Sequence, residues 1–155
     1  MGSWDPTHAL TLNGGASVTE VCKLLDPEAM LRRVLSGMDG QQEFAVSLAR
    51  FPEGTRLWGP RASGWPLCFL QAAGAATAMM VEVSQFDASG ELGLYKLGCR
   101  GSDEQGAAQL EVRWRGRAET VPKLEVFTAQ QAGDIFVHYY RTDSVPDWCT
   151  LRRFE

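Results

Sequence analysis

Apolar residues near the N-terminus recur with the spacing of an α-helix. Ser17 begins a capping-box pattern, and apolar residues follow it on one helical face, which predicts a helix over residues 17–25. Asp26 and Pro27 then have the residue types of a helix cap and of a first helical turn. A second helical segment is therefore expected from these residues to Gly37, whose type suits a helix end.

The same helical spacing returns near the C-terminus. Thr128 suits an N-cap, and the residues after it separate into an apolar and a polar face. The apolar face consists of Ala132, Ile135, Phe136 and Tyr139, and the polar face consists of Gln130, Asp134, His138 and Arg141. This pattern predicts an amphipathic helix with a buried apolar side.

Elsewhere short apolar and alternating runs bounded by turn residues predict β-strands. The strands are expected at residues 8–12, 43–51, 67–70, 76–83, 92–97, 110–114, 118–121 and 147–154. Because most of these runs are joined by short turns, the sequence predicts an α+β fold. It should be an antiparallel β-sheet with an N-terminal and a C-terminal helix packed on it.

The length and composition of the chain suit a single domain. Its 155 residues are 45% hydrophobic and 22% charged, which is enough to build one sizeable core. No apolar run reaches the length of a membrane-spanning helix, and no basic region followed by an apolar stretch marks a secretion signal. One cytoplasmic domain over residues 1–155 is therefore expected, without a membrane partner. The five residues Val112, Trp114, Phe136, Tyr139 and Trp148 are expected to lie together in the single core of this domain.

Acidic residues are concentrated in the middle of the chain. Residues 82–111 contain six acidic and two basic side chains, a balance of −4 that equals the net charge of the whole chain. A solvated surface fits this distribution, and so does an acidic patch that attracts a basic partner. The six acidic residues are Glu82, Asp87, Glu91, Asp103, Glu104 and Glu111.

Two tryptophans, Trp58 and Trp65, lie in a segment rich in Pro, Gly and Arg that is expected to be a loop over residues 52–66. Such rings either fold over the core or anchor a protein interface.

The residues that could carry catalysis are scattered. The four cysteines form no C-x-x-C pair and are expected to be free thiols, with only Cys99 exposed. Asp134 and His138 are four residues apart, which fits a surface pair better than a general-base site. Trp114 falls on the strand face opposite its neighbouring arginines, and the chain is acidic, so nucleic acid is not expected as a partner. No catalytic, cofactor or metal site is predicted; an enzyme would have to rely on Cys99 or His138.

A C-terminal pattern carries a family resemblance. Gly116 follows a strand, Val121 precedes Pro122, Ala132 lies in the helix, and residues 142–151 read T-D-S-V-P-D-W-C-T-L. This part of the chain resembles a family of bacterial immunity proteins, which are encoded beside polymorphic toxins that typically carry a nucleic-acid deaminase domain. The family's ending is T-G-x-x-P-x-x-V-x-W.

Two residues depart from that ending: Asp143 stands where the family usually has Gly, and Leu151 where it usually has Trp. Asp also tolerates turn conformations, so the turn itself is compatible with the change. The resemblance implies a non-catalytic cytoplasmic protein that binds a cognate toxin and covers its active site. The toxin would be a secreted DNA or RNA cytidine deaminase, whose basic cleft would receive the acidic residues, with Trp58 and Trp65 as further contact candidates.

A second class of function fits the same features. Chaperones of secreted effectors are also small acidic α/β proteins, and they usually act as dimers that wrap an extended segment. For an immunity protein, a monomer or a weak homodimer that meets a folded toxin domain is expected instead.

Overall fold

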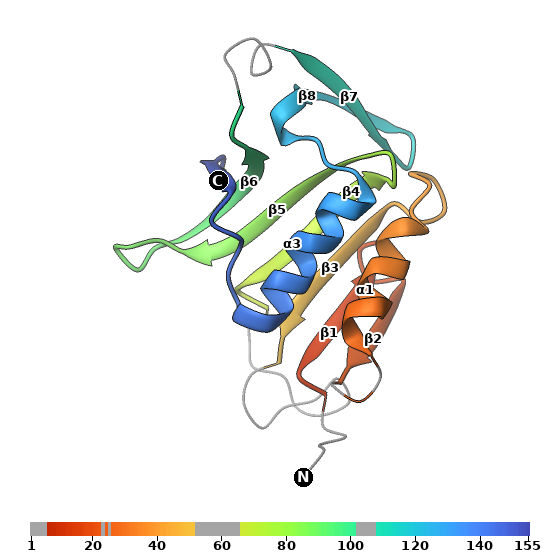
Figure 1. Cartoon of the computed structure of the whole chain (residues 1–155), viewed down its shortest axis with the longest axis vertical. Coiled ribbons are helices and arrows are strands. Elements are labelled where there is room, and N and C mark those ends of the chain that lie inside the picture. Colours follow the sequence, from red (N-terminus) through yellow and green to blue (C-terminus); the bar gives the residue numbers. More distant parts are fainter. Residues whose placement is uncertain (1–5, 23, 25, 52–65, 102–107) are drawn as a thin grey trace.

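The computed structural model describes residues 6–22, 24, 26–51, 66–101 and 108–155. Its central feature is a seven-stranded antiparallel sheet with the order β2-β1-β3-β4-β5-β6-β9 (Figure 1). The strands are β1 (His8–Leu12), β2 (Ser17–Val21), β3 (Ala45–Arg50), β4 (Phe69–Ala75), β5 (Ala78–Phe86), β6 (Leu92–Cys99) and β9 (Cys149–Arg153). A separate hairpin contains β7 (Gln109–Trp114) and β8 (Arg117–Pro122). The helices are α1 (Pro27–Ser36), α3 (Ala129–Thr142) and the short 3-10 helix η2 (Lys123–Glu125), so the predicted α+β class is confirmed.

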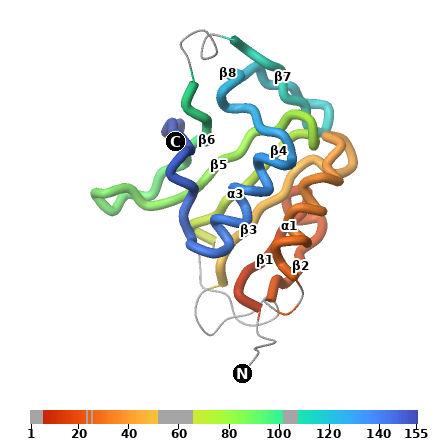
Figure 2. The backbone as a smooth tube through the Cα atoms, viewed as in Figure 1, coloured from red at the N-terminus to blue at the C-terminus, as the bar shows by residue number. Residues whose placement is uncertain are grey.

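Both α-helices lie on the same side of the sheet and share one core with it (Figures 1 and 2). Leu31 and Leu35 of α1 and Phe136 of α3 are fully buried against strand residues such as Leu48 and Val81. This layer of helices on one sheet face forms the main core. Within the described part of the chain, no helix is both long and apolar enough to cross a membrane.

Both helices begin where the sequence predicts. The Asp26 carboxylate accepts a hydrogen bond from the Ala29 amide at 3.3 Å, and Gly37 follows the last turn of α1. Thr128 and Gln131 form a complete capping box at the start of α3. Each cap satisfies amides that the first helical turn leaves without partners, which explains why these two boundaries are legible in the sequence.

The helix predicted over residues 17–25 is wrong, because Ser17–Val21 is strand β2. Asn13 and Gly14 both have positive φ angles, 52° and 69°, and form a tight turn after β1. This turn aligns Leu12 with Ser17 and leads into an antiparallel pair. Strand pairing with β1 therefore overrides a capping-box pattern that is only local.

A second, smaller core lies beneath the β7–β8 hairpin. Val112 and Val121 of the hairpin pack against Met80 of β5, with Trp114 partly buried beside them. Gly74 allows this approach: its φ is 133°, and a Cβ there would lie 2.9 Å from Val112 Cγ1. A glycine at this place lets the hairpin pack directly over the end of β4.

The five residues predicted to share one core therefore separate. Phe136 and Tyr139 belong to the main core, and Val112 and Trp114 to the hairpin core. Trp148 is 43% exposed, so its predicted burial is wrong. Alternation assigns a residue to a face of its own element, but it does not say which other element covers that face.

Candidate functional site

The sheet face turned away from the helices carries polar residues across its centre. Successive side chains of a strand point to opposite faces, so the strand register assigns each residue to one face. The polar row runs through neighbouring strands and consists of Thr11, Ser47, Gln71, Glu82, Lys96 and Arg152. We call this side of the sheet the open face, because α1 and α3 both lie on the other side.

Lys96 is the buried charge of the open face. Its side chain is 9% exposed, and its Nζ lies 3.6 Å from Glu82 Oε2 and 3.1 Å from Glu119 Oε1 of the hairpin. Gln71 Nε2 donates a hydrogen bond to Glu82 Oε1 at 2.8 Å. Two carboxylates thus surround one ammonium group, and Arg152, which pairs with Glu125, also interacts electrostatically with Glu119. The three carboxylates of this cluster exceed its two cations by one, so the cluster can attract a further cation.

A groove of about 290 Å³ opens beside these carboxylates. Glu82 and Glu119 line it together with the aromatic residues Phe44 and Trp114. The guanidinium of Arg115 already lies 5.5 Å from the centre of the Phe44 ring, so a cation is accepted against this surface. The small residues Ala45, Ser47 and Ala73 also line the groove. Carboxylates and aromatic rings over small residues form a suitable receptor for a protruding lysine or arginine side chain.

The far end of the open face carries exposed apolar residues. Phe86 and Leu92 are cross-strand partners, and they are 50% and 39% exposed. Leu67, also 50% exposed, lies next to the same strands, since its carbonyl accepts a hydrogen bond from Ser84 at 2.6 Å. Large apolar side chains grouped at one end of a polar surface are typical of protein-binding sites.

The acidic residues predicted as contacts do not form one patch. Glu82 lines the groove, whereas Glu111 lies on β7 and pairs with Arg113. Asp87 and Glu91 lie in the turn between β5 and β6, which projects from the sheet (Figure 1). The remaining predicted contacts, Asp103, Glu104, Trp58 and Trp65, lie outside the described residues.

Asp87 has a structural role in its turn. Its Oδ1 accepts hydrogen bonds from the Ser89 amide at 2.8 Å, the Ser89 hydroxyl at 2.5 Å and the Glu91 amide at 3.0 Å. The Ser89 hydroxyl and these amides hold the pKa of Asp87 below its usual value. Glu91 is exposed, so it is the better contact candidate of the two.

Sequence reasoning missed three of the residues around the groove. Phe44 and Glu119 were not predicted as site residues, and Trp114 was predicted as a core residue and rejected as a nucleic-acid contact. Glu119 lies outside the acidic segment and reaches Lys96 because the hairpin packs on the sheet. The sequence of β8 shows no clear apolar–polar alternation, so the position of the hairpin was needed to identify Glu119 as part of the groove.

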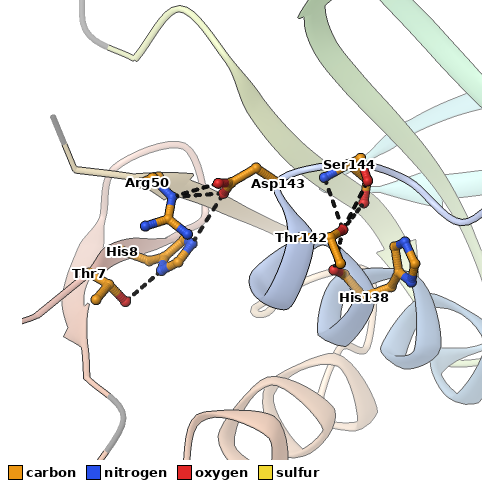
Figure 3. Close-up of polar contacts among 7 residues, drawn as sticks. All are labelled: Thr7, His8, Arg50, His138, Thr142, Asp143 and Ser144. Carbon is orange, nitrogen blue, oxygen red and sulfur yellow. Dashed lines mark hydrogen bonds and ion pairs between the residues drawn. The ribbon is translucent and has the colours of Figure 1, made fainter.

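A second polar cluster lies at the other end of the sheet, on the helix-covered face (Figure 3). His8 is 1% exposed, and its Nδ1 lies 2.7 Å from the Thr7 hydroxyl. Its Nε2 lies 3.9 Å from Asp143 Oδ1, and Asp143 accepts hydrogen bonds from Arg50 Nε at 2.8 Å. The ring of Tyr140 lies 4.6 Å from the imidazole. The cluster connects β1 and β3 with the end of α3.

Hydroxyl, imidazole and carboxylate are the groups of a hydrolytic triad, but the geometry does not suit catalysis. Burial, reinforced by the charge of Arg50, lowers the pKa of His8 to about 4, which makes it a weak base at neutral pH. The distance of 3.9 Å to Asp143 also exceeds hydrogen-bonding range. The arrangement therefore fits a structural link.

The second histidine, His138, does not pair with Asp134, the carboxylate four residues before it in the sequence. Asp134 binds Arg32 of α1 instead, at 2.8 Å. Thr142 donates a hydrogen bond to the backbone carbonyl of His138, as Figure 3 shows. Nothing in these contacts activates the His138 imidazole.

The cysteines are free thiols, as expected, but the prediction that only Cys99 is exposed is wrong. Cys22 is buried, whereas Cys68, Cys99 and Cys149 are all partly exposed. Burial raises the pKa of the Cys99 thiol, which lowers its content of reactive thiolate. Among the described residues, no three His, Cys, Asp or Glu side chains gather closely enough to hold a metal ion.

Comparison of the chain with models of known protein families gave no match, and comparison with curated proteins gave none either.

Proposed function

We propose that this protein is an immunity protein that binds and inhibits a cognate bacterial toxin. The toxin is a secreted DNA or RNA cytidine deaminase, and inhibition occurs by covering its active site. The supporting observation is the open face, where Glu82 and Glu119 line a groove with two aromatic residues. An enzyme that binds nucleic acid presents cationic side chains to phosphates, and the same side chains fit a groove of this composition.

Binding combines two parts of the open face. The carboxylates attract and orient the basic partner, which mainly increases the rate of association. The exposed Phe86 and Leu92 then supply apolar contact area, which mainly slows dissociation. The protein itself performs no catalysis in this proposal and acts in the cytoplasm, as a monomer or a weak homodimer.

The resemblance of residues 142–151 to the immunity family is compatible with the backbone at this place. Asp143 has a φ of 59°, in the left-handed region where glycine is the most favourable residue. Asp is tolerated there, and its carboxylate contacts Arg50. Asp at the position of the family's usual Gly is therefore compatible with the left-handed backbone that ends α3.

The test measures association with the deaminase domain encoded by the adjacent gene. Glu119→Lys combined with Glu91→Lys should reduce the association rate constant about tenfold at low salt and flatten its salt dependence. Glu28→Lys combined with Asp134→Lys, on α1 and α3, is the matched control, because it makes a charge change of the same size on the opposite side of the sheet. Thermal melting of each variant shows whether its fold is retained. Equal rates for the double variant and the wild type would remove the groove from the mechanism.

The alternative function is a chaperone for a secreted effector. That function predicts binding to an extended segment of the effector and no inhibition of a folded deaminase domain. A deaminase assay with the folded domain therefore separates the two proposals: stoichiometric inhibition supports the immunity function, and binding without inhibition supports the chaperone.

A further inference from the structure

Cys99 and Cys149 face each other across the last strand pair of the sheet. Cys99 ends β6 and Cys149 begins β9, and the register makes them cross-strand partners. Both thiols pack against the main core, and both are partly exposed. The sequence spacing gives no indication of this pair, because η2, α3 and the β7–β8 hairpin lie between the two cysteines.

The hydrogen-bond pattern places the pair at a position where side chains approach closely. Phe154 donates to the Leu94 carbonyl at 3.0 Å, and bonded pairs alternate with non-bonded pairs from there. Cys99 and Cys149 lie five residues along their strands from Leu94 and Phe154, which is a non-bonded position. In agreement with this, the Cys149 amide donates its hydrogen bond to the Pro146 carbonyl, at 3.0 Å, and not across the strand pair. Such pairs have Cα atoms about 4.5 Å apart, within the range of about 4.4–6.8 Å that disulfides span.

We propose that Cys99 and Cys149 are a redox-active pair that forms an intramolecular disulfide when the protein meets a disulfide oxidant such as oxidised glutathione. The Cys99 thiolate attacks one glutathione sulfur, forms a mixed disulfide and releases the first glutathione. The Cys149 thiolate then attacks the Cys99 sulfur and releases the second glutathione. The protein loses two electrons and two protons, and these reduce one oxidised glutathione to two thiols.

The surroundings of the pair determine how it behaves. Cys99 lines a pocket of about 300 Å³ beside η2, through which an oxidant can reach its sulfur. Burial raises the pKa of Cys99, and burial together with the neighbouring Cys99 raises the pKa of Cys149 to about 12. Scarce thiolate makes formation slow, but it also leaves the reduced form without thiolate stabilisation. The bond is therefore a slow and durable tie between β6 and the edge strand β9, and in a reducing compartment the dithiol persists.

The test incubates the purified full-length protein with oxidised glutathione at pH 8.5, where more thiolate is present. The expected product has lost two hydrogens by intact mass, and peptide mapping finds Cys99 joined to Cys149. Closing this loop should raise the melting temperature by about 5–15 °C, reversibly with a reductant.

Matched variants separate this pair from the other thiols. Cys99→Ser and Cys149→Ser should each abolish the oxidant-dependent rise, whereas Cys68→Ser should keep it. Peptide mapping of the wild type gives an answer even where a variant folds poorly. Four free thiols after oxidation, a persistent glutathione adduct, a bond to Cys22 or Cys68, or a disulfide-linked dimer would each overturn the proposal.

Discussion

The two faces of the same sheet differ sharply, although every strand contributes to both. On the covered face, Leu10, Leu48, Leu70 and Val83 form one cross-strand row and are almost completely buried. The polar row of the open face crosses the same strands at the positions adjacent to these residues, whose side chains point to the opposite face. The covered face is organised for packing, whereas the open face keeps charge and apolar area accessible for a partner.

The two faces also bury ionisable groups in different ways. His8 lies on the covered face, where burial lowers its pKa to about 4 and keeps it neutral. Lys96 lies on the open face, where it is surrounded by the carboxylates of Glu82 and Glu119. The covered face thus buries His8 as a neutral group, whereas the open face buries Lys96 beside carboxylates of opposite charge.

The largest expected effect is the loss of a core ring from the covered face. Phe136→Ala should lower the free energy of unfolding by about 3–5 kcal/mol, because it leaves a cavity between α3 and the sheet. Urea denaturation monitored by circular dichroism measures the change. A loss below about 1 kcal/mol would contradict the packing of α3 on this face.

The pH dependence of stability tests the buried histidine. Because the pKa of His8 is about 4 in the folded protein and near 6.5 when unfolded, only the unfolded state binds this proton between these values. The contribution of His8 is complete above pH 6.5 and decreases as the pH falls toward 4. Between pH 7 and pH 5 it should amount to about 2 kcal/mol.

Urea denaturation at both pH values measures this dependence. His8→Gln should reduce it by that amount, whereas His138→Gln, the matched control, should leave most of it intact. Identical slopes for the wild type and His8→Gln would contradict the burial of a neutral imidazole.

The charge cluster of the open face should contribute less. Lys96→Met removes the ammonium group that lies between Glu82 and Glu119, and should destabilise the protein by about 1–2 kcal/mol, because Glu119 is partly solvated and keeps its interaction with Arg152. Adding Glu119→Gln should recover part of the loss. Thermal melting of the single and double variants measures the coupling, and simple additivity would contradict a direct interaction.

The smallest effect on stability should come from the apolar end of the open face. Phe86→Ala should change the free energy of unfolding by less than about 1 kcal/mol, because half of its side chain is already exposed. The same variant should accelerate dissociation of the toxin domain, which surface plasmon resonance can measure. Unchanged dissociation would remove Phe86 from the interface.

Local signals in the sequence were sufficient for the elements with strong caps or turns. Asp26, Thr128 and Gln131 identify the starts of α1 and α3, because their side chains bond amides within one turn of the chain. The alternation in β7 and the turn residue Gly116 likewise identify that hairpin. These interactions form between residues that are close in sequence, so the sequence alone contains them.

Tertiary contacts decided the rest. Residues 17–21 form a strand because β1 is available to pair with them, against their local helical pattern. The meeting of Glu82 with Glu119, of His8 with Asp143 and of Cys99 with Cys149 depends on strand order and on where the hairpin and α3 pack. Hydrophobic burial is non-directional and fixes no partner by sequence distance, so these groupings exist only once the whole sheet is assembled.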